Sequence, residues 1–130
     1  MAIIIKTDNP KELLNTALDK LEGINEEQCT YKLRYDPQRK CFWSFRPIYG
    51  GYHGECNADS VNDYFLKPVC KDDMLILCGV KNDGSTVTYH TYYTIHERLL
   101  WFFMRYMDKV IDSVEITLNP HPEYDEANSD

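Results

Sequence analysis

The sequence predicts an α+β fold, in which a mainly antiparallel β-sheet carries two principal amphipathic helices packed on one face. Residues 10–22 and 96–112 repeat apolar side chains with the period of a helix. Residues 31–46 and 74–95 instead show strand patterns, either alternating or continuously apolar, on both sides of short turn sequences. The predicted order of elements is β-α-β-β-(α)-β-β-α-β, where the parentheses mark a short helix.

The chain begins with a strand over residues 1–6, which is followed by the clearest helix in the sequence. Asp8 or Asn9 caps this helix. Pro10 suits its first position, because the N–H that proline lacks would have no partner there. Gly23 is its natural end. One side of the helix is apolar and is expected to pack on the sheet. This side consists of Leu13, Leu14, Ala17, Leu18 and Leu21.

A β-hairpin is predicted over residues 31–46, with a turn at 36–39 where a proline presets the backbone. Cys41, Trp43 and Phe45 share one face of its returning strand. The hairpin holds five basic residues against one acidic residue, which makes it the only basic stretch of the chain. The basic residues are Lys32, Arg34, Arg39, Lys40 and Arg46.

Residues 59–68 predict a short helix, because Ser60 and Asp63 have the spacing of a capping box and Pro68 ends the segment. The next segment, 74–80, is an apolar run that predicts a strand buried on both faces. The sheet therefore resumes after this short helical interruption.

The turn sequence NDGS at residues 82–85 leads into a second predicted strand over 86–95. Thr94 and Glu97 then have the spacing of a capping box, which places the start of a helix over 96–112. This helix has a broad apolar face. It is expected either to lie at the centre of the core or to meet another chain through an exposed edge.

One domain is predicted over residues 1–118, ending in a strand at 114–118. A chain of 130 residues and 15.3 kDa has the size of a single domain. The remaining residues, 119–130, contain prolines and acidic side chains with little apolar surface to bury. They are therefore expected to form a disordered tail.

The net charge of −7 argues against direct binding to nucleic acids, because attraction to phosphates dominates such binding. It favours a partner with a basic surface instead. The five cysteines include no CxxC pair, and the N-terminus does not resemble a signal peptide. Reduced thiols and a cytoplasmic location are therefore expected. No apolar run is long enough for a membrane span.

The loop over residues 46–57 is rich in glycine and aromatic residues, but it matches no phosphate-binding motif. His53 and Cys56 form the only close pair of metal-ligating types, whereas zinc sites usually contain two such pairs. Glu55 and Asp59 flank Cys56 and would raise the pKa of its thiol, which disfavours an activated nucleophile. No catalytic residue, metal or cofactor is predicted.

The leading hypothesis is a small inhibitor that neutralises an enzyme, such as a toxin nuclease or a host-defence nuclease, by occupying its basic surface. Carboxylates would supply steering and specificity, and buried aromatic side chains would supply most of the affinity. The candidate carboxylates are Glu55, Asp59, Asp63, Asp72 and Asp73. The candidate anchors are Tyr49, Tyr52, Trp101 and Phe102. An exposed edge at Trp101 and Phe102 would also favour a homodimer through helix 96–112.

In size, acidity and lack of catalytic motifs, the chain resembles toxin-neutralising immunity proteins and phage inhibitors of host defence, including anti-CRISPR proteins. This resemblance is one of general composition, and it carries over no residues. A second hypothesis is a small-ligand or nucleotide-binding protein, because arginines and aromatic rings gather around the hairpin and its loop. Its candidate residues are Arg34, Arg46, Tyr49, Tyr52 and His53. A third is a small enzyme that uses His53, Cys56 or His90.

Overall fold

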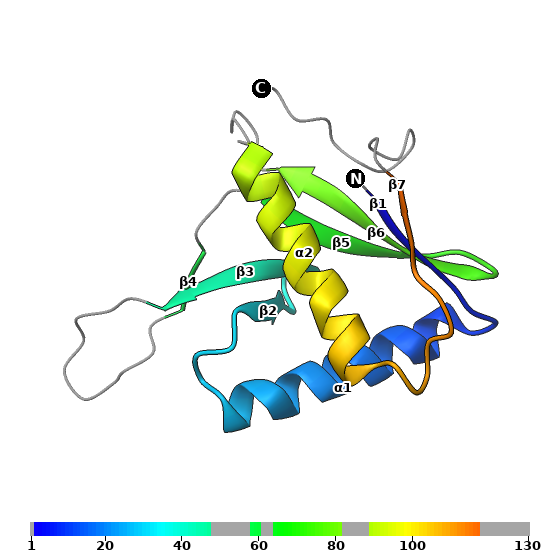
Figure 1. Ribbon diagram of the computed structural model, residues 1–130, viewed down its shortest axis with the longest axis horizontal. Helices are drawn as coiled ribbons and strands as arrows, with labels where there is room; N and C mark the ends of the chain where they lie inside the picture. Colours follow the sequence, from blue (N-terminus) through cyan, green and yellow to red (C-terminus); the bar gives the residue numbers. More distant parts are fainter. Residues whose placement is uncertain (1, 48–57, 61–63, 82–88, 118–130) are drawn as a thin grey trace.

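The computed structural model describes residues 2–47, 58–60, 64–81 and 89–117 (Figure 1). Two long helices and seven strands lie within these residues. In chain order they are β1 (Ala2–Lys6), α1 (Pro10–Glu27), β2 (Leu33–Asp36), β3 (Cys41–Pro47), β4 (Ala58–Ser60), β5 (Tyr64–Cys70), β6 (Met74–Lys81), α2 (Tyr89–Tyr106) and β7 (Glu115–Thr117).

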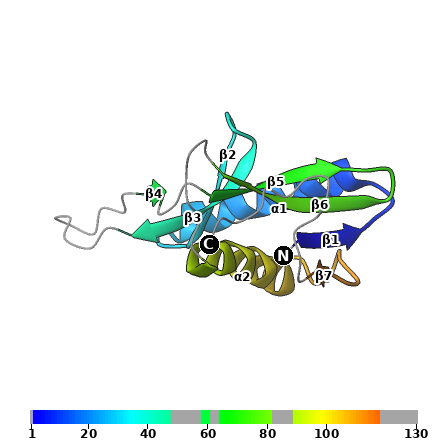
Figure 2. The same ribbon diagram turned by 90° about the horizontal axis from the view of Figure 1, so that it is seen from above.

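The strands form an antiparallel sheet in the order β2-β3-β5-β6-β1-β7, and β4 pairs with β3 beside this path. Figure 2 shows α2 lying along one side of this sheet. The central strand β6 is buried on both faces from Leu75 to Gly79, as its apolar sequence predicts. The predicted α+β class with a mainly antiparallel sheet is confirmed.

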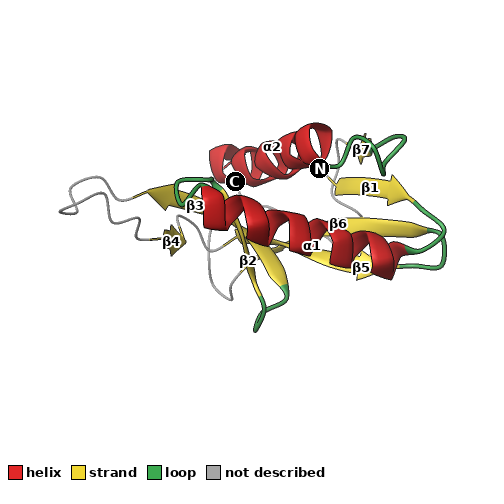
Figure 3. Cartoon of the chain, turned by 90° about the horizontal axis from the view of Figure 1, so that it is seen from below, coloured by secondary structure: helices red, strands yellow, loops and turns green. Residues whose placement is uncertain are grey.

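Both helices pack into the same hydrophobic core. Helix α1 contacts β2, β5 and β6, and α2 contacts β1, β3 and β5. Figure 3 shows α1 running along β5 and β6. One cluster of buried side chains joins the helices to one face of the sheet. Its most deeply buried members are Ile3, Ile5, Ala17, Leu21, Leu33, Phe42, Leu66, Leu75, Leu77, Ile95, Leu99, Phe102, Phe103 and Met107.

Helix α1 begins where the sequence predicts it. The Oδ1 atom of Asn9 accepts a hydrogen bond from the backbone N–H of Glu12 at 3.1 Å, and Nδ2 donates to Glu12 Oε2 at 3.0 Å. The helix does not end at Gly23 but continues to Glu27. The added turn buries Ile24, which extends the apolar stripe into the core. This burial outweighs the cost of a helical glycine, about 1 kcal/mol.

The predicted hairpin over 31–46 is confirmed as β2 and β3, in register from Leu33 opposite Ser44 to Asp36 opposite Cys41. The turn between them occupies 37–40. The backbone N–H of Lys40 donates to the carbonyl of Asp36 at 2.7 Å. Lys40 has a φ of 56°. This left-handed backbone conformation is uncommon for residues other than glycine and occurs mostly in tight turns.

The prediction of a short helix over 59–68 is wrong, because the described residues of this segment belong to strands β4 and β5. Seven residue pairs join β5 to β6, from Tyr64 opposite Lys81 to Cys70 opposite Leu75. The aromatic and β-branched side chains of this segment suit a strand. Pro68 fits because β3 is paired with β5 only at Leu66, so that the strand is open on one side at the proline.

The strand predicted over 86–95 is also wrong, because α2 already begins at Tyr89. Residues 82–88, which include the predicted turn, lie outside the described residues. Ile95, Leu99 and Phe102 follow one another with helical spacing and are all buried. His96, at the start of the helix predicted over 96–112, is also buried and only 2% exposed. The alternating pattern that predicted a strand is therefore outweighed by the burial of apolar side chains along one face of α2.

Candidate functional site

The structure separates the two aromatic residues that the sequence placed together as anchors. Trp101 is 50% exposed, whereas Phe102 is fully buried in the core. Consecutive residues on a helix point about 100° apart, so one faces solvent and the other faces the sheet. Phe102 is therefore a core residue, and only Trp101 of this pair is available to a partner.

The predicted carboxylates do not form one described surface. Asp72 and Asp73 are exposed on the turn between β5 and β6. The carbonyl of Asp73 accepts a hydrogen bond from the N–H of Thr7, just before α1, at 3.0 Å. The backbone of Asp59 lies opposite that of Arg46 in the register of β4 and β3. The other predicted loop residues lie outside the described residues: Tyr49, Tyr52, His53, Glu55, Cys56 and Asp63.

Arg34 ties the end of α1 to β2. Its guanidinium donates to the side-chain oxygen of Asn25 and to the carbonyls of Cys29 at 2.6 Å and Tyr31 at 3.0 Å. Asn25 in turn donates to the carbonyl of Leu33 at 3.2 Å. These hydrogen bonds satisfy polar groups of the connection between α1 and β2, the edge strand of the sheet. The arginine that was predicted to bind a ligand therefore has a structural role in the connection.

An open groove of about 600 Å³ lies between the C-terminal half of α1 and β2. We call it the acidic groove, because Glu22 and Glu26 line it on the helix side, although Arg34 also lines it from β2. Tyr35 lines the opposite side and packs edge-to-face on Phe42, with ring centroids 5.0 Å apart. Burial raises the pKa of Tyr35, with Cys41 and Asp36 adding to this effect. The phenol therefore stays protonated and able to donate a hydrogen bond at neutral pH.

The carboxylates of the acidic groove stand in an unfavourable electrostatic position. Glu22 and Glu26 are four residues apart on a helix, where like charges repel. They also lie near the C-terminus, where the helix dipole disfavours negative charge. The last turn of α1 contains no basic residue. A bound cation would reduce the repulsion between these two carboxylates, in addition to the charge of Arg34, which lines the same groove.

The groove was not predicted from the sequence, although the distribution of acidic residues along α1 is consistent with it. Four of the acidic residues on α1 lie in the second half of the helix. That pattern suggests an ordinary solvated helix face when it is considered alone. Tyr35 joins the carboxylates only because β2 folds back against the helix.

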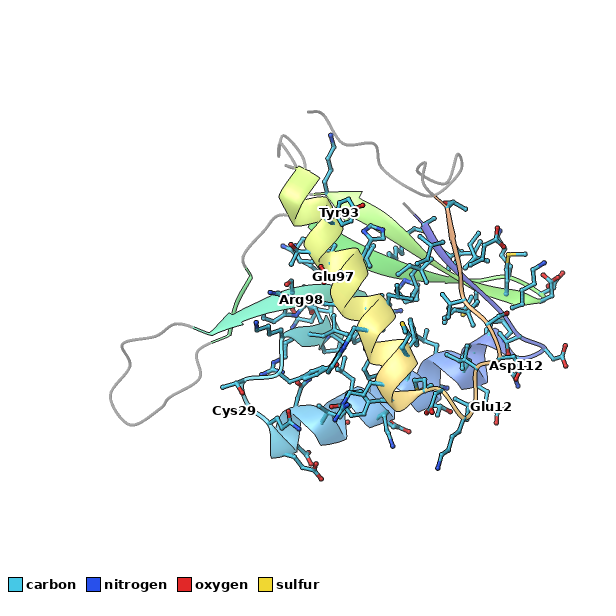
Figure 4. All side chains as sticks on the ribbon, in the orientation of Figure 1. Glu12, Cys29, Tyr93, Glu97, Arg98 and Asp112 are labelled. Carbon is cyan, nitrogen blue, oxygen red and sulfur yellow. The ribbon has the colours of Figure 1, made fainter. Side chains whose placement is uncertain are left out.

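A second groove, of about 540 Å³, lies between α2 and the connection from α1 to β2. We call it the α2 groove. Arg98 donates from its guanidinium to Ser44 Oγ on β3. Burial lowers the pKa of Arg98, and Glu97 opposes that shift. Figure 4 shows Glu97 and Arg98 on α2, with Cys29 on the connection below them. The groove is lined by Gln28, Thr30, Tyr31, Lys32, Leu33, Thr94, Glu97, Arg98 and Trp101.

Aromatic rings form one wall of the α2 groove. The centroids of Tyr31 and Trp101 are 6.3 Å apart, and Tyr106 meets both rings edge-on at 5.9 and 6.2 Å. Burial raises the pKa of Tyr31 to about 12, Tyr106 adds to the shift, and Arg105 opposes it. Its hydroxyl is therefore neutral at physiological pH. The α2 groove combines two cations, the carboxylate of Glu97, a hydroxyl donor and flat apolar surfaces.

The part of the chain that the structure describes contains no cluster of three metal-ligating side chains. Its cysteines are free thiols, and burial is the main cause that raises the pKa of Cys41. Such a shift disfavours a reactive thiolate. Among the same residues, no helix has the length and apolar character needed to cross a bilayer.

Comparisons with protein-family models, curated proteins and solved structures find no match to the chain. The described residues form an α+β domain that contains the acidic groove and the α2 groove, whose lining has mixed charge.

Proposed function

We propose that this protein is a stoichiometric inhibitor that binds a basic protein surface through the acidic groove. In this function it would act like an immunity protein, or like a phage anti-defence or anti-CRISPR protein, on an enzyme such as a nuclease. The observation that carries the proposal is the position of Glu22 and Glu26, which face a groove at the C-terminal half of α1. A basic side chain in this groove would relieve repulsion that the free chain tolerates.

Each part of the acidic groove has a role in such binding. The carboxylates attract an arginine or lysine of the partner and set its orientation. Tyr35 and the aliphatic side chain of Leu18 provide surface on which its hydrocarbon stem packs. The net charge of −7 adds long-range steering towards a basic enzyme. Trp101 is a further exposed aromatic side chain, although it lines the other groove.

Reversing both carboxylates, as Glu22→Lys with Glu26→Lys, is expected to weaken binding of a fluorescent arginine-rich peptide by about 100-fold. Fluorescence anisotropy measures this loss. The variant should keep the fold and about the stability of the parent, because the favourable interaction of lysine with a helix C-terminus, about 0.3–1 kcal/mol, offsets the repulsion among the two lysines and Arg34. Lost binding without lost stability would therefore locate the site in the acidic groove.

The matched control is Asp72→Lys with Asp73→Lys, which makes the same change in net charge at the turn between β5 and β6. That variant should retain most of the binding, apart from a small loss of steering. An equal loss in both variants would mean that the peptide responds to total charge. Such a result would refute the acidic groove as the binding site.

A second candidate function is the binding of a small anionic ligand with a flat ring, such as a nucleotide, in the α2 groove. Arg98 favours it, because a half-buried guanidinium beside Lys32 and aromatic rings can hold a phosphate and a base. This site uses different residues from those that the sequence suggested. Among the predicted set, Arg34 is occupied by its own chain, and Arg46 lies on β3.

A nucleoside monophosphate that binds this groove should raise the melting temperature and quench Trp101 fluorescence. At a hundredfold excess over Kd, the stabilisation is about 2.7 kcal/mol. Lys32→Ala should raise Kd by about tenfold, whereas Lys40→Ala in the same hairpin should leave it unchanged. The absence of a melting shift with any common nucleotide would exclude this function.

A further inference from the structure

Helix α2 exposes large apolar side chains on the side that faces away from the sheet. Tyr93 is 45% exposed, Trp101 50% and Met104 66%. The opposite side of the same helix is fully engaged in the core. A surface helix normally carries polar residues on its outer side. These three side chains therefore form a partly exposed apolar stripe, in which Trp101 also contacts the rings of Tyr31 and Tyr106.

Two charged residues flank Trp101 symmetrically along this side of the helix. Glu97 precedes Trp101 by four residues, and Arg105 follows it by four. Residues with this spacing lie on one side of a helix. The guanidinium of Arg105 already sits over the Trp101 ring, 5.5 Å from its centroid. Figure 4 shows Tyr93 and Glu97 one turn apart along α2.

The order of acid, tryptophan and base is self-complementary when two such helices run antiparallel. A two-fold axis at Trp101 would bring both tryptophans together. It would also set Glu97 of each copy against Arg105 of the other. In a two-fold interface every contact occurs twice, so this arrangement creates two ion pairs around an aromatic centre. Tryptophan and arginine are the residues most common at the centre of such contacts.

We propose that two copies of this chain associate through the outer side of α2, in an antiparallel arrangement centred on Trp101. The charge order favours a second copy over a different partner. A basic enzyme surface would meet Arg105 at one end of the stripe, whereas a second copy satisfies both charges. The acidic groove on α1 and β2 takes no part in this contact, and both sites of the dimer remain open.

The mass in solution tests the proposal directly. Light scattering should give a mass that rises with concentration from 15.3 kDa towards twice that value. Glu97→Arg and Arg105→Glu, made separately, each convert both ion pairs into like-charge contacts. Each variant should dissociate at least about tenfold more readily. Both sites are exposed, so each variant is expected to fold normally.

Mixing the two variants provides the decisive measurement. One copy then presents two arginines and the other two glutamates, so that both cross-interface pairs become attractive again. The mixture should form a heterodimer, and the double variant Glu97→Arg with Arg105→Glu should form a homodimer. Unchanged dimerisation in the single variants would overturn the arrangement, and so would a mixture that stays monomeric.

Other occupants of the stripe give different results. A parent protein that stays monomeric throughout the concentration series would refute self-association. A nucleotide that binds the α2 groove without changing the mass would show that Trp101 serves a ligand instead. The variant with Glu22→Lys and Glu26→Lys should dimerise like the parent, so the failure of the proposed inhibitor function remains separate from the failure of this inference.

Discussion

Replacing Phe102 with alanine is expected to reduce the free energy of unfolding by about 3–5 kcal/mol. The side chain is fully buried where α2 meets the sheet. Its ring lies 5.5 Å from that of Phe103 and 5.9 Å from that of Tyr106. Truncation removes these contacts and leaves a cavity that the surrounding strands can fill only in part.

Urea unfolding, followed by circular dichroism, measures the change. If Phe102→Ala does not fold, Phe102→Leu should give a smaller loss at the same site. Trp101→Ala is the matched control on the neighbouring residue, measured in dilute protein where the chain is monomeric. It should cost less than about 1 kcal/mol, because half of this side chain is already in water. Equal losses at both positions would contradict the described orientation of α2.

Replacing Arg34 with methionine is expected to cost about 2–3 kcal/mol of stability, the next largest effect. Methionine keeps most of the aliphatic stem but removes every donor. The carbonyls of Cys29 and Tyr31 then lose charge-assisted hydrogen bonds, and the side-chain oxygen of Asn25 loses its donor. The connection from α1 to β2 should loosen, which would also disturb the acidic groove.

Thermal unfolding measures the loss, and hydrogen exchange should show weaker protection at the end of α1. Arg34→Lys should recover only part of the stability, because an ammonium group cannot reproduce the planar fork. Arg39→Met in the same hairpin is the control. Its ion pair with Asp36 is 4.0 Å long and half exposed, and its contact with the Phe65 ring is modest. It should change stability by no more than about 1 kcal/mol. A comparable loss there would refute a special role for Arg34.

The correctly predicted parts of the fold depend on interactions between residues close in the chain. The cap at Asn9 and the proline after it act within one turn of α1, so the start of that helix could be read directly. The hairpin of β2 and β3 is also local, because four turn residues join strands with alternating side chains.

The errors arose where distant residues outweighed local preference. Gly23 signals a helix end, yet Ile24 finds the core and extends α1. The capping-box spacing at Ser60 is overridden by the pairing of β5 with β6. Aromatic and β-branched residues at the start of α2 favour a strand locally, but burial of Ile95, Leu99 and Phe102 on one face favours the helix. The residue pattern of one segment does not show which other segments of the chain will pack against that segment.

By itself, the sequence determined an acidic α+β chain with a capped first helix and a basic hairpin. Only the tertiary structure decided that Phe102 is buried while Trp101 is exposed, and that Tyr35 faces Glu22 and Glu26 across a groove. Caps, turns and alternation act over a few residues, so they can be recognised along the chain. Burial and grooves depend on which distant segments meet, and that choice is made by the packing of the whole core.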